Sequence, residues 1–264
     1  MSLISSGSNV YRDGYILYNY DGYNYRLVRS ISKDSGWELL EKFKDNWNFS
    51  ISNKDDVLKA TISRAKRNVR EVALCNDFNY FVTLTIADKN VRYNVDFCFS
   101  SLREILKKIK RKYPEFIYLF ICEKHKDGAY HFHGLVNNIY NFYINNNGYI
   151  SCKYFDNLGF NSFLQIKHDE NSKQKISNYI TKYITKDFVS CSAGTSYIVS
   201  RGVKRPSKEK FKNYKDIENL DLYFKNKFTY ENDFCKIYDF NINNLSDKEK
   251  VEIISLFNEV NKND

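Results

Sequence analysis

The feature that most constrains the fold is the stretch from Glu123 to Val136, in which two short β-favouring runs flank a turn. Lys126-Asp127-Gly128 is a hairpin signal. His131 and His133 lie two residues apart in the second run. Because side chains on a strand alternate between its faces, both imidazoles point to the same side. The stretch predicts an antiparallel hairpin whose histidines lie close enough to share one divalent ion.

The length of the turn decides whether a carboxylate joins these histidines. A two-residue Asp-Gly loop pairs His131 with Lys124 and turns Glu123 to the opposite face. A three-residue loop with Gly128 in the left-handed conformation pairs Glu123 with His131 instead. We favour the second register, because it yields a three-ligand site with positions left open for a substrate.

A strand and an amphipathic helix are predicted just before this hairpin. Asn79–Ile86 alternates, so that Val82, Leu84 and Ile86 face the core. Asp96–Tyr113 has apolar residues at helical spacing and cations near its end, and Pro114 then stops it. Its apolar stripe consists of Leu102, Ile105, Leu106 and Ile109.

The segment Ser177–Lys186 repeats with a period of four residues. Its Ile, Thr and Tyr content leans towards a strand. The spacing of Ile176, Ile180 and Ile184 favours a helix, with these residues as its packing stripe. On a helix, two pairs of like residues stack one turn apart, namely Tyr179 with Tyr183 and Lys182 with Lys186.

The remaining sequence gives weaker signals. Asp21-Gly22 predicts a two-residue hairpin loop between Tyr15–Tyr20 and Tyr23–Val28. Helices are expected at Trp37–Trp47 and Asp56–Val72, and a capping box at Ser246–Glu249 opens a last helix. Residues 142–167 are hard to interpret beyond a turn at 145–148 and a candidate strand at 163–166. His168 lies in a polar run and is expected on the surface.

Charge and cysteine content narrow the class of protein. The chain has 41 basic and 32 acidic residues, a net charge of +9, which suits a polyanionic partner such as nucleic acid. Its six cysteines are scattered without a Cys-x-x-Cys pair, as expected for free thiols in a reducing cytosol. We find no secretory signal and no membrane-spanning run, so a cytoplasmic protein without a membrane partner is expected.

Three motifs together resemble the HUH endonucleases, the initiators of rolling-circle replication in plasmids and small phages. They are Phe-x-Thr-Leu-Thr at 81–85, Glu-x-His-x-Asp-Gly-x-x-His-x-His at 123–133 and Tyr-x-x-Lys-Tyr-x-x-Lys at 179–186. They occur in the family order, and the resemblance covers roughly Ser63–Pro206. The third motif corresponds to the two-tyrosine form of the family.

The resemblance implies a fold and a reaction. The fold is α+β, an RRM-like (ferredoxin-like) antiparallel sheet of about five strands with flanking helices. Glu123, His131 and His133 would hold Mg²⁺ or Mn²⁺. Tyr183 would attack the scissile phosphate and form a 5′-phosphotyrosine link, and Tyr179 would make the second attack. Lys182 or Lys186 would offset negative charge.

The expected partner is single-stranded origin DNA in a bacterial host cell. Two basic groups are candidate phosphate contacts, one in the 56–72 helix and one in the turn at 200–206; they comprise Arg64, Lys66, Arg67 and Arg70, and Arg201, Lys204 and Arg205. The chain has no Walker loop, so unwinding is assigned to a separate host helicase. We divide the chain into an N-terminal hairpin and helices (1–70), the endonuclease core (71–210) and a C-terminal helical extension (211–264).

Rival interpretations remain open. An HUH transposase or relaxase uses the same chemistry, although single-tyrosine transposases are usually shorter and relaxases typically have a third histidine, with the tyrosine near the N-terminus. A non-catalytic RRM-like nucleic-acid-binding module needs neither the metal ligands nor the paired tyrosines. These two features favour the replication initiator.

Overall fold

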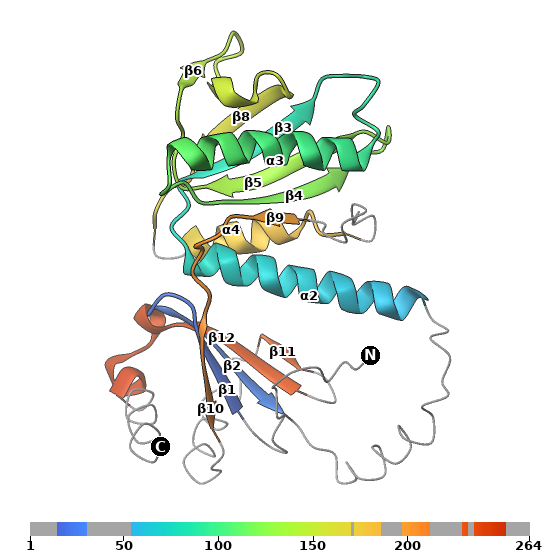
Figure 1. Ribbon diagram of the computed structural model, residues 1–264. Coiled ribbons are helices and arrows are strands. Elements are labelled where there is room, and N and C mark those ends of the chain that lie inside the picture. The colour runs from blue at the N-terminus through green and yellow to red at the C-terminus, as the bar shows by residue number, and fades with distance from the viewer. Residues whose placement is uncertain are drawn as a thin grey trace. The chain divides into compact units, whose positions relative to one another are not determined.

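The computed structural model describes residues 15–30, 54–169, 172–185, 197–211, 229–231 and 235–251 (Figure 1). The chain forms two compact units. One consists of Asn53–Arg205, and the other combines Met1–Ser52 with Pro206–Asp264. The predicted helix at Trp37–Trp47 lies outside the described residues.

An antiparallel sheet of seven strands organises the Asn53–Arg205 unit. In spatial order the strands are β6 (Phe142–Ile144), β7 (Ile150–Cys152), β8 (Gly159–Gln165), β3 (Tyr80–Ile86), β5 (Tyr130–Val136), β4 (Tyr118–Lys124) and β9 (Tyr197–Val199). The helices are α2 (Lys54–Cys75), α3 (Val95–Lys112), α4 (Ser172–Thr181) and the short 3₁₀ helix η1 (Lys153–Phe155). The expected α+β fold is confirmed; the sheet exceeds five strands because three-residue strands extend both edges.

One face of this sheet packs on α3, which crosses it in Figure 1. The helix begins where the Asn94 side chain accepts a hydrogen bond from the Phe97 amide, 3.0 Å away, and Pro114 follows its end. Its buried residues are Cys98, Phe99, Leu102, Leu106 and Ile109. They meet the inward side chains of the central strands, which include Val82, Leu84, Phe120 and Phe132. Burying each large side chain contributes roughly 1.5–3 kcal/mol.

The opposite face of the sheet is covered in part by α2 and α4. Val69 and Val72 of α2 pack with Ile180 of α4 and with Leu119 and Leu135 of the sheet. Residues 54–70 therefore belong to the same unit as the sheet, and our domain boundary at residue 70 was wrong. The basic character of this helix concealed its apolar stripe, which is narrow because α2 buries only one side.

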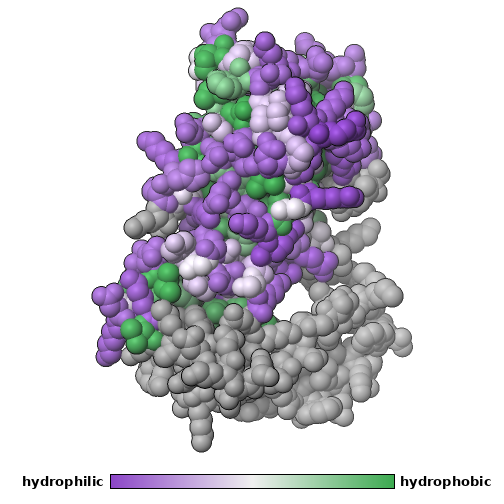
Figure 2. Space-filling view, turned by 60° about the vertical axis from the view of Figure 1, so that its left-hand side comes forward, coloured by the Kyte–Doolittle hydropathy of each residue, from purple (hydrophilic) through white to green (hydrophobic). Residues whose placement is uncertain are grey.

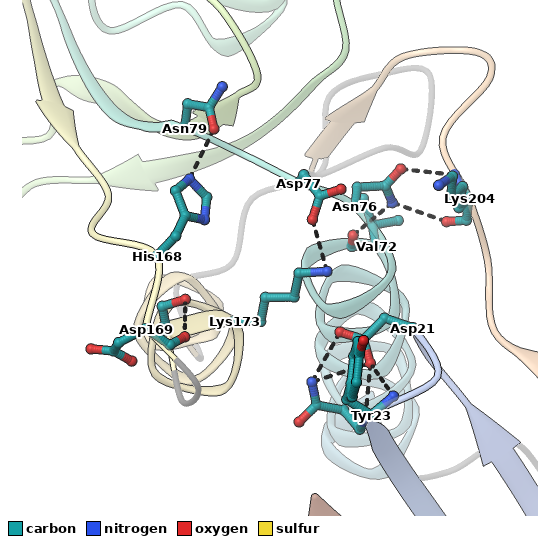
Figure 3. A network of polar contacts seen from close by, with 12 residues as sticks. Asp21, Tyr23, Val72, Asn76, Asp77, Asn79, His168, Asp169, Lys173 and Lys204 are labelled. Carbon is teal, nitrogen blue, oxygen red and sulfur yellow. Dashed lines mark hydrogen bonds and ion pairs between the residues drawn. The ribbon is translucent and has the colours of Figure 1, made fainter. Parts of the chain in front are cut away.

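The C-terminal end of α2 is tied to the turn that precedes Pro206 (Figure 3). The buried Asn76 amide donates to the carbonyls of Val72, at 2.8 Å, and Lys204, at 3.0 Å. Its oxygen accepts from the Lys204 amide at 2.9 Å. Nearby, His168 is exposed, as expected, and its Nε2 lies 2.9 Å from Asn79 Oδ1. These contacts fix the chain on either side of β3.

The second unit contains an antiparallel five-stranded sheet. Its spatial order is β10 (Ser207–Phe211), β1 (Tyr15–Asn19), β2 (Asn24–Ser30), β12 (Cys235–Asn241) and β11 (Tyr230–Glu231). The predicted hairpin between β1 and β2 forms, but with a three-residue loop, because the Tyr20 amide bonds to the Asn24 carbonyl at 3.0 Å. The side chain of Asp21 stabilises this longer turn by accepting from two backbone amides.

The segment after residue 211 differs from the helical extension that we predicted. β11 and β12 come from it, and β12 pairs with β2 along its whole length. An ion pair of 2.7 Å between Arg26 and Asp239 joins these strands. The alternating Ile237-Tyr238-Asp239-Phe240 pattern was the overlooked strand signal. The capping box is confirmed, since Ser246 and Glu249 exchange side-chain and backbone hydrogen bonds and helical residues follow.

No helix in the described part of the chain combines the length and the apolar character needed to cross a bilayer.

Candidate active site

The hairpin between β4 and β5 has the register that we favoured. Glu123 lies opposite His131, and Gly128 has a φ of 87°. The His125 amide donates to the Ala129 carbonyl at 2.8 Å, which leaves Lys126-Asp127-Gly128 as a three-residue loop. Only glycine adopts this left-handed conformation without strain. The register prediction is therefore confirmed.

Cross-strand pairing gathers the candidate ligands on one face. Thr85, His131 and Glu123 form one row across β3, β5 and β4, and Thr83 and His133 belong to the neighbouring row. Residues directly opposite each other in an antiparallel sheet point to the same side. This is the face that α2 and α4 cover in part, opposite to α3.

Glu123 and His133 are in direct contact. The Oε2 atom of Glu123 lies 2.8 Å from Nε2 of His133, whose residue is 7 % exposed. Threonine hydroxyls approach the other ring nitrogens, with Thr83 Oγ1 at 3.5 Å from His133 Nδ1 and Thr85 Oγ1 at 3.0 Å from His131 Nδ1. The threonines thereby orient both imidazoles through Nδ1 and leave each Nε2 for another partner.

A third histidine belongs to this cluster, and our residue-based prediction left it out. The rings of His125 and His131 stack with centroids 3.7 Å apart, and His125 Nε2 lies 3.7 Å from Glu123 Oε2. The signal was its position two residues after Glu123 on the same strand, which places both side chains on one face.

The histidine environment disfavours the charged imidazolium. Burial lowers the pKa of His133 below its usual value, against the opposing effect of the hydrogen bond with Glu123. Burial also lowers the pKa of His131, and the neighbouring His125 adds to the decrease. The Ala129 amide, which donates to Asp127, lowers the pKa of that exposed carboxyl group. Both histidines of the His-x-His pair are thus favoured in the neutral state.

The two tyrosines meet at this cluster. The Tyr183 ring stacks on the His133 ring with centroids 3.7 Å apart, and its hydroxyl donates to the Tyr179 hydroxyl at 3.0 Å. Burial raises the pKa of Tyr183, and the hydrogen bond to Tyr179 raises it further. Tyr179 is 43 % exposed, so it is the more accessible of the two phenols.

The helix prediction for this segment is confirmed as far as Thr181. α4 ends there, and Tyr183 lies in the turn that follows, where its amide bonds to the Ile180 carbonyl at 3.3 Å. The Lys182 ammonium lies 5.4 Å from the centroid of the Tyr179 ring. Lys186, the other predicted lysine, lies outside the described residues.

The donor set suits a divalent cation in kind, although it does not yet converge. Within the ranges that the structure describes, no three His, Cys, Asp or Glu side chains are arranged to hold a metal ion. Two imidazoles and one carboxylate on a common face, supported by threonine hydroxyls, nevertheless match the ligand preferences of metals such as Mn²⁺. We therefore treat Glu123, His131 and His133 as candidate ligands only.

The two predicted basic groups lie on elements that touch each other. Arg64, Lys66 and Arg67 of α2 are exposed, as are Arg201, Lys204 and Arg205. The Arg205 guanidinium donates to the Asn68 carbonyl of α2 at 3.2 Å. Arg70 instead donates to Asn178 Oδ1 at 3.0 Å, next to Tyr179. Contacts of these residues with DNA remain a prediction.

Comparison with known proteins gives one match. Residues 79–188 match the replication-associated protein family of the ORF2 type. The matched segment covers less than half of the chain but contains β3, the hairpin, α4 and both tyrosines. No curated protein and no solved structure matches significantly. The match supports a replication initiator of the Rep type.

Proposed function

We propose that this protein nicks single-stranded origin DNA by tyrosine attack, as an HUH rolling-circle replication initiator does. The observation that supports this most directly is the stacking of Tyr183 on His133, which forms a 2.8 Å contact with Glu123. A nucleophile thus lies against the candidate ligands. The match to a replication-associated family supports the biological setting.

The proposed reaction is an in-line displacement at phosphorus. The phenol oxygen of Tyr183 forms a bond to the scissile phosphorus, and the bond from phosphorus to the 3′ oxygen breaks. The new 3′ hydroxyl takes up a proton, and the 5′ end stays on the tyrosine, which conserves the ester for later rejoining. The displacement requires that charge on the phosphate oxygens be offset as it builds.

The residues around the tyrosines divide this work. The Tyr183 hydroxyl donates to Tyr179, so Tyr179 is the first acceptor on the path of the phenol proton towards solvent. Lys182, beside the Tyr179 ring, supplies a positive charge close to the phenols. Tyr179 is itself a nucleophile for a second attack, since its hydroxyl lies 3.0 Å from that of Tyr183.

Mg²⁺ or Mn²⁺ held by His131, His133 and Glu123 would act as a Lewis acid on the scissile phosphate. The threonine hydroxyls at both Nδ1 atoms orient the two imidazoles for that role. The exposed cations of α2 and of the 201–205 turn would contact the DNA backbone. A separate helicase would open the duplex.

A covalent adduct tests this proposal. The protein is incubated with a random-sequence pool of single-stranded DNA and Mn²⁺, and adducts are separated on a denaturing gel and mapped by mass spectrometry. We expect an adduct on Tyr183 that Tyr183→Phe abolishes and Tyr179→Phe retains, with poorer handling of successive rounds. Tyr113→Phe, at the end of α3 on the opposite side of the sheet, is the matched control.

The outcomes separate the alternatives. An adduct that survives in the double variant Tyr179→Phe/Tyr183→Phe excludes this helix as the source of the nucleophile. An adduct found on Tyr179 alone reverses the order of attack. Loss of cleavage in His131→Ala and in EDTA supports the metal role, whereas cleavage by His131→Ala/His133→Ala refutes it. DNA binding without any adduct points to a non-catalytic module.

A further inference from the structure

A groove with a volume of about 660 Å³ opens beside the tyrosines. Phe81 and Thr83 of β3 and Leu164 of β8 line it on the sheet side, and Tyr179 of α4 lines it on the helix side. The volume lies within the range of roughly 300–1,000 Å³ that is usual for small-molecule sites. The sheet face that carries the histidines therefore continues into a ligand-sized recess.

Strand register explains why the groove is on that face. Leu164 lies opposite Phe81, and Ser162 lies opposite Thr83, which in turn lies opposite His133. The side chains of each row point the same way. The groove and the histidine cluster thus share Thr83 and are adjacent parts of one surface.

Large apolar side chains remain exposed around the groove. Leu164 is 70 % exposed, and Tyr149, in the turn between β6 and β7, is 54 % exposed. Tyr149 meets Phe160 of β8 edge to face, with ring centroids 6.1 Å apart. Figure 2 likewise shows hydrophobic residues at the surface towards the top of the molecule, where Figure 1 places β6. Adjacent exposed apolar groups of this size indicate a binding surface.

The polar groups of the groove suit a nucleotide. Ser162 and Gln165 offer a hydroxyl and an amide to the edge of a base, between the apolar faces of Leu164 and Tyr149. The exposed lysines Lys167 and Lys175 also line it, and Lys175 lies 3.2 Å from Asp169. An apolar slot with polar edges and cations nearby matches a base attached to its phosphate.

We infer that this groove holds an unpaired base of single-stranded DNA, next to the phosphate presented to Tyr179 and Tyr183. The inference rests on the proposed function and adds the substrate feature that the site reads. A strand that brings a phosphate to the tyrosines must pass over the adjoining surface, and Tyr179 belongs to both places. Bases in a duplex are stacked and paired, so the groove selects an unstacked strand.

The test separates base contacts from phosphate contacts. Fluorescence anisotropy measures binding of the full chain to a thymidine oligonucleotide and to an abasic strand of equal length and charge. We expect Tyr149→Ser/Leu164→Ser to weaken thymidine binding about 5- to 150-fold, the loss of one stacked base, and to leave abasic binding unchanged. Phe97→Ser, which removes an exposed aromatic ring from α3, is the matched control and should change neither.

Four outcomes decide the inference. Equal affinity of the groove variant and the parent protein for thymidine overturns it. Equal weakening for both strands also overturns it, because the defect is then electrostatic or a folding defect. A change in oligomeric state on sedimentation assigns the groove to a second copy of the chain instead. The expected selective loss supports the base site even if no covalent adduct forms, so it stands or falls separately from the proposed nicking.

Discussion

Gly134 provides a sharp test of how the metal-motif strand is built. It follows His133 on β5, but it points to the α3 side of the sheet and lies opposite Phe120 of β4. A Cβ at this position would overlap the Phe120 ring and would come within 2.9 Å of the Leu119 carbonyl oxygen. The Phe120 ring is fully buried among Tyr118 and Phe155 and has little room to move.

The expected cost of Gly134→Ala follows from this overlap. Overpacking a filled core costs roughly 1–3 kcal/mol. Replacing glycine also restricts the unfolded chain, which offsets about 0.4–1 kcal/mol. We therefore expect Gly134→Ala to lower the free energy of unfolding by about 1–2 kcal/mol.

A double-mutant cycle isolates the contact. Phe120→Leu removes the ring that the new methyl group would strike, so Gly134→Ala should cost almost nothing in that background. Urea unfolding followed by circular dichroism gives the four free energies. If Gly134→Ala costs the same with Phe120 as with leucine, the ring is not the reason for glycine, and the reasoning is refuted.

Three further predictions concern other sites. Gly128→Ala should cost about 1–2 kcal/mol of unfolding free energy, measured by urea unfolding, because its φ of 87° strains any other residue although the space is open; no loss would contradict the left-handed turn. Asn76→Ala should cost about 1–3 kcal/mol and speed trypsin cleavage after Lys204, because the buried backbone groups lose their partners; unchanged cleavage would show that the turn is held otherwise. Burial raises the pKa of the Cys98 and Cys152 thiols to about 11, so both should resist iodoacetamide at pH 8 in the native protein and react after unfolding, as mass spectrometry would report; rapid native alkylation would contradict their burial.

Much of the core unit was predictable because its signals are local. The alternation of Asn79–Ile86 predicted β3, and the stripe around Leu102 predicted α3. Gly128 set the hairpin register through its turn alone. The four-residue period of Ile176, Ile180 and Ile184 outweighed the strand propensity of the residues between them as far as Thr181.

Long-range pairing caused the misses. β12 reaches β2 across more than two hundred residues, and no local pattern specifies which strand it joins. The boundary at residue 70 failed because α2 looked basic, whereas its assignment to the unit depends on where Val69 and Val72 find apolar partners. Phe160 and Leu164 gave no readable signal, because their significance lies in the strand beside them.

The sequence by itself determined the hairpin, its register and the shared face of Glu123, His131 and His133, since a turn and a two-residue alternation fix these over a dozen residues. Only the tertiary structure decided that Tyr183 stacks on His133 and that a groove continues from Tyr179 along β8. Such contacts join residues fifty or more positions apart. Their geometry depends on how α2 and α4 pack on the sheet, a result of the whole core rather than of any one segment.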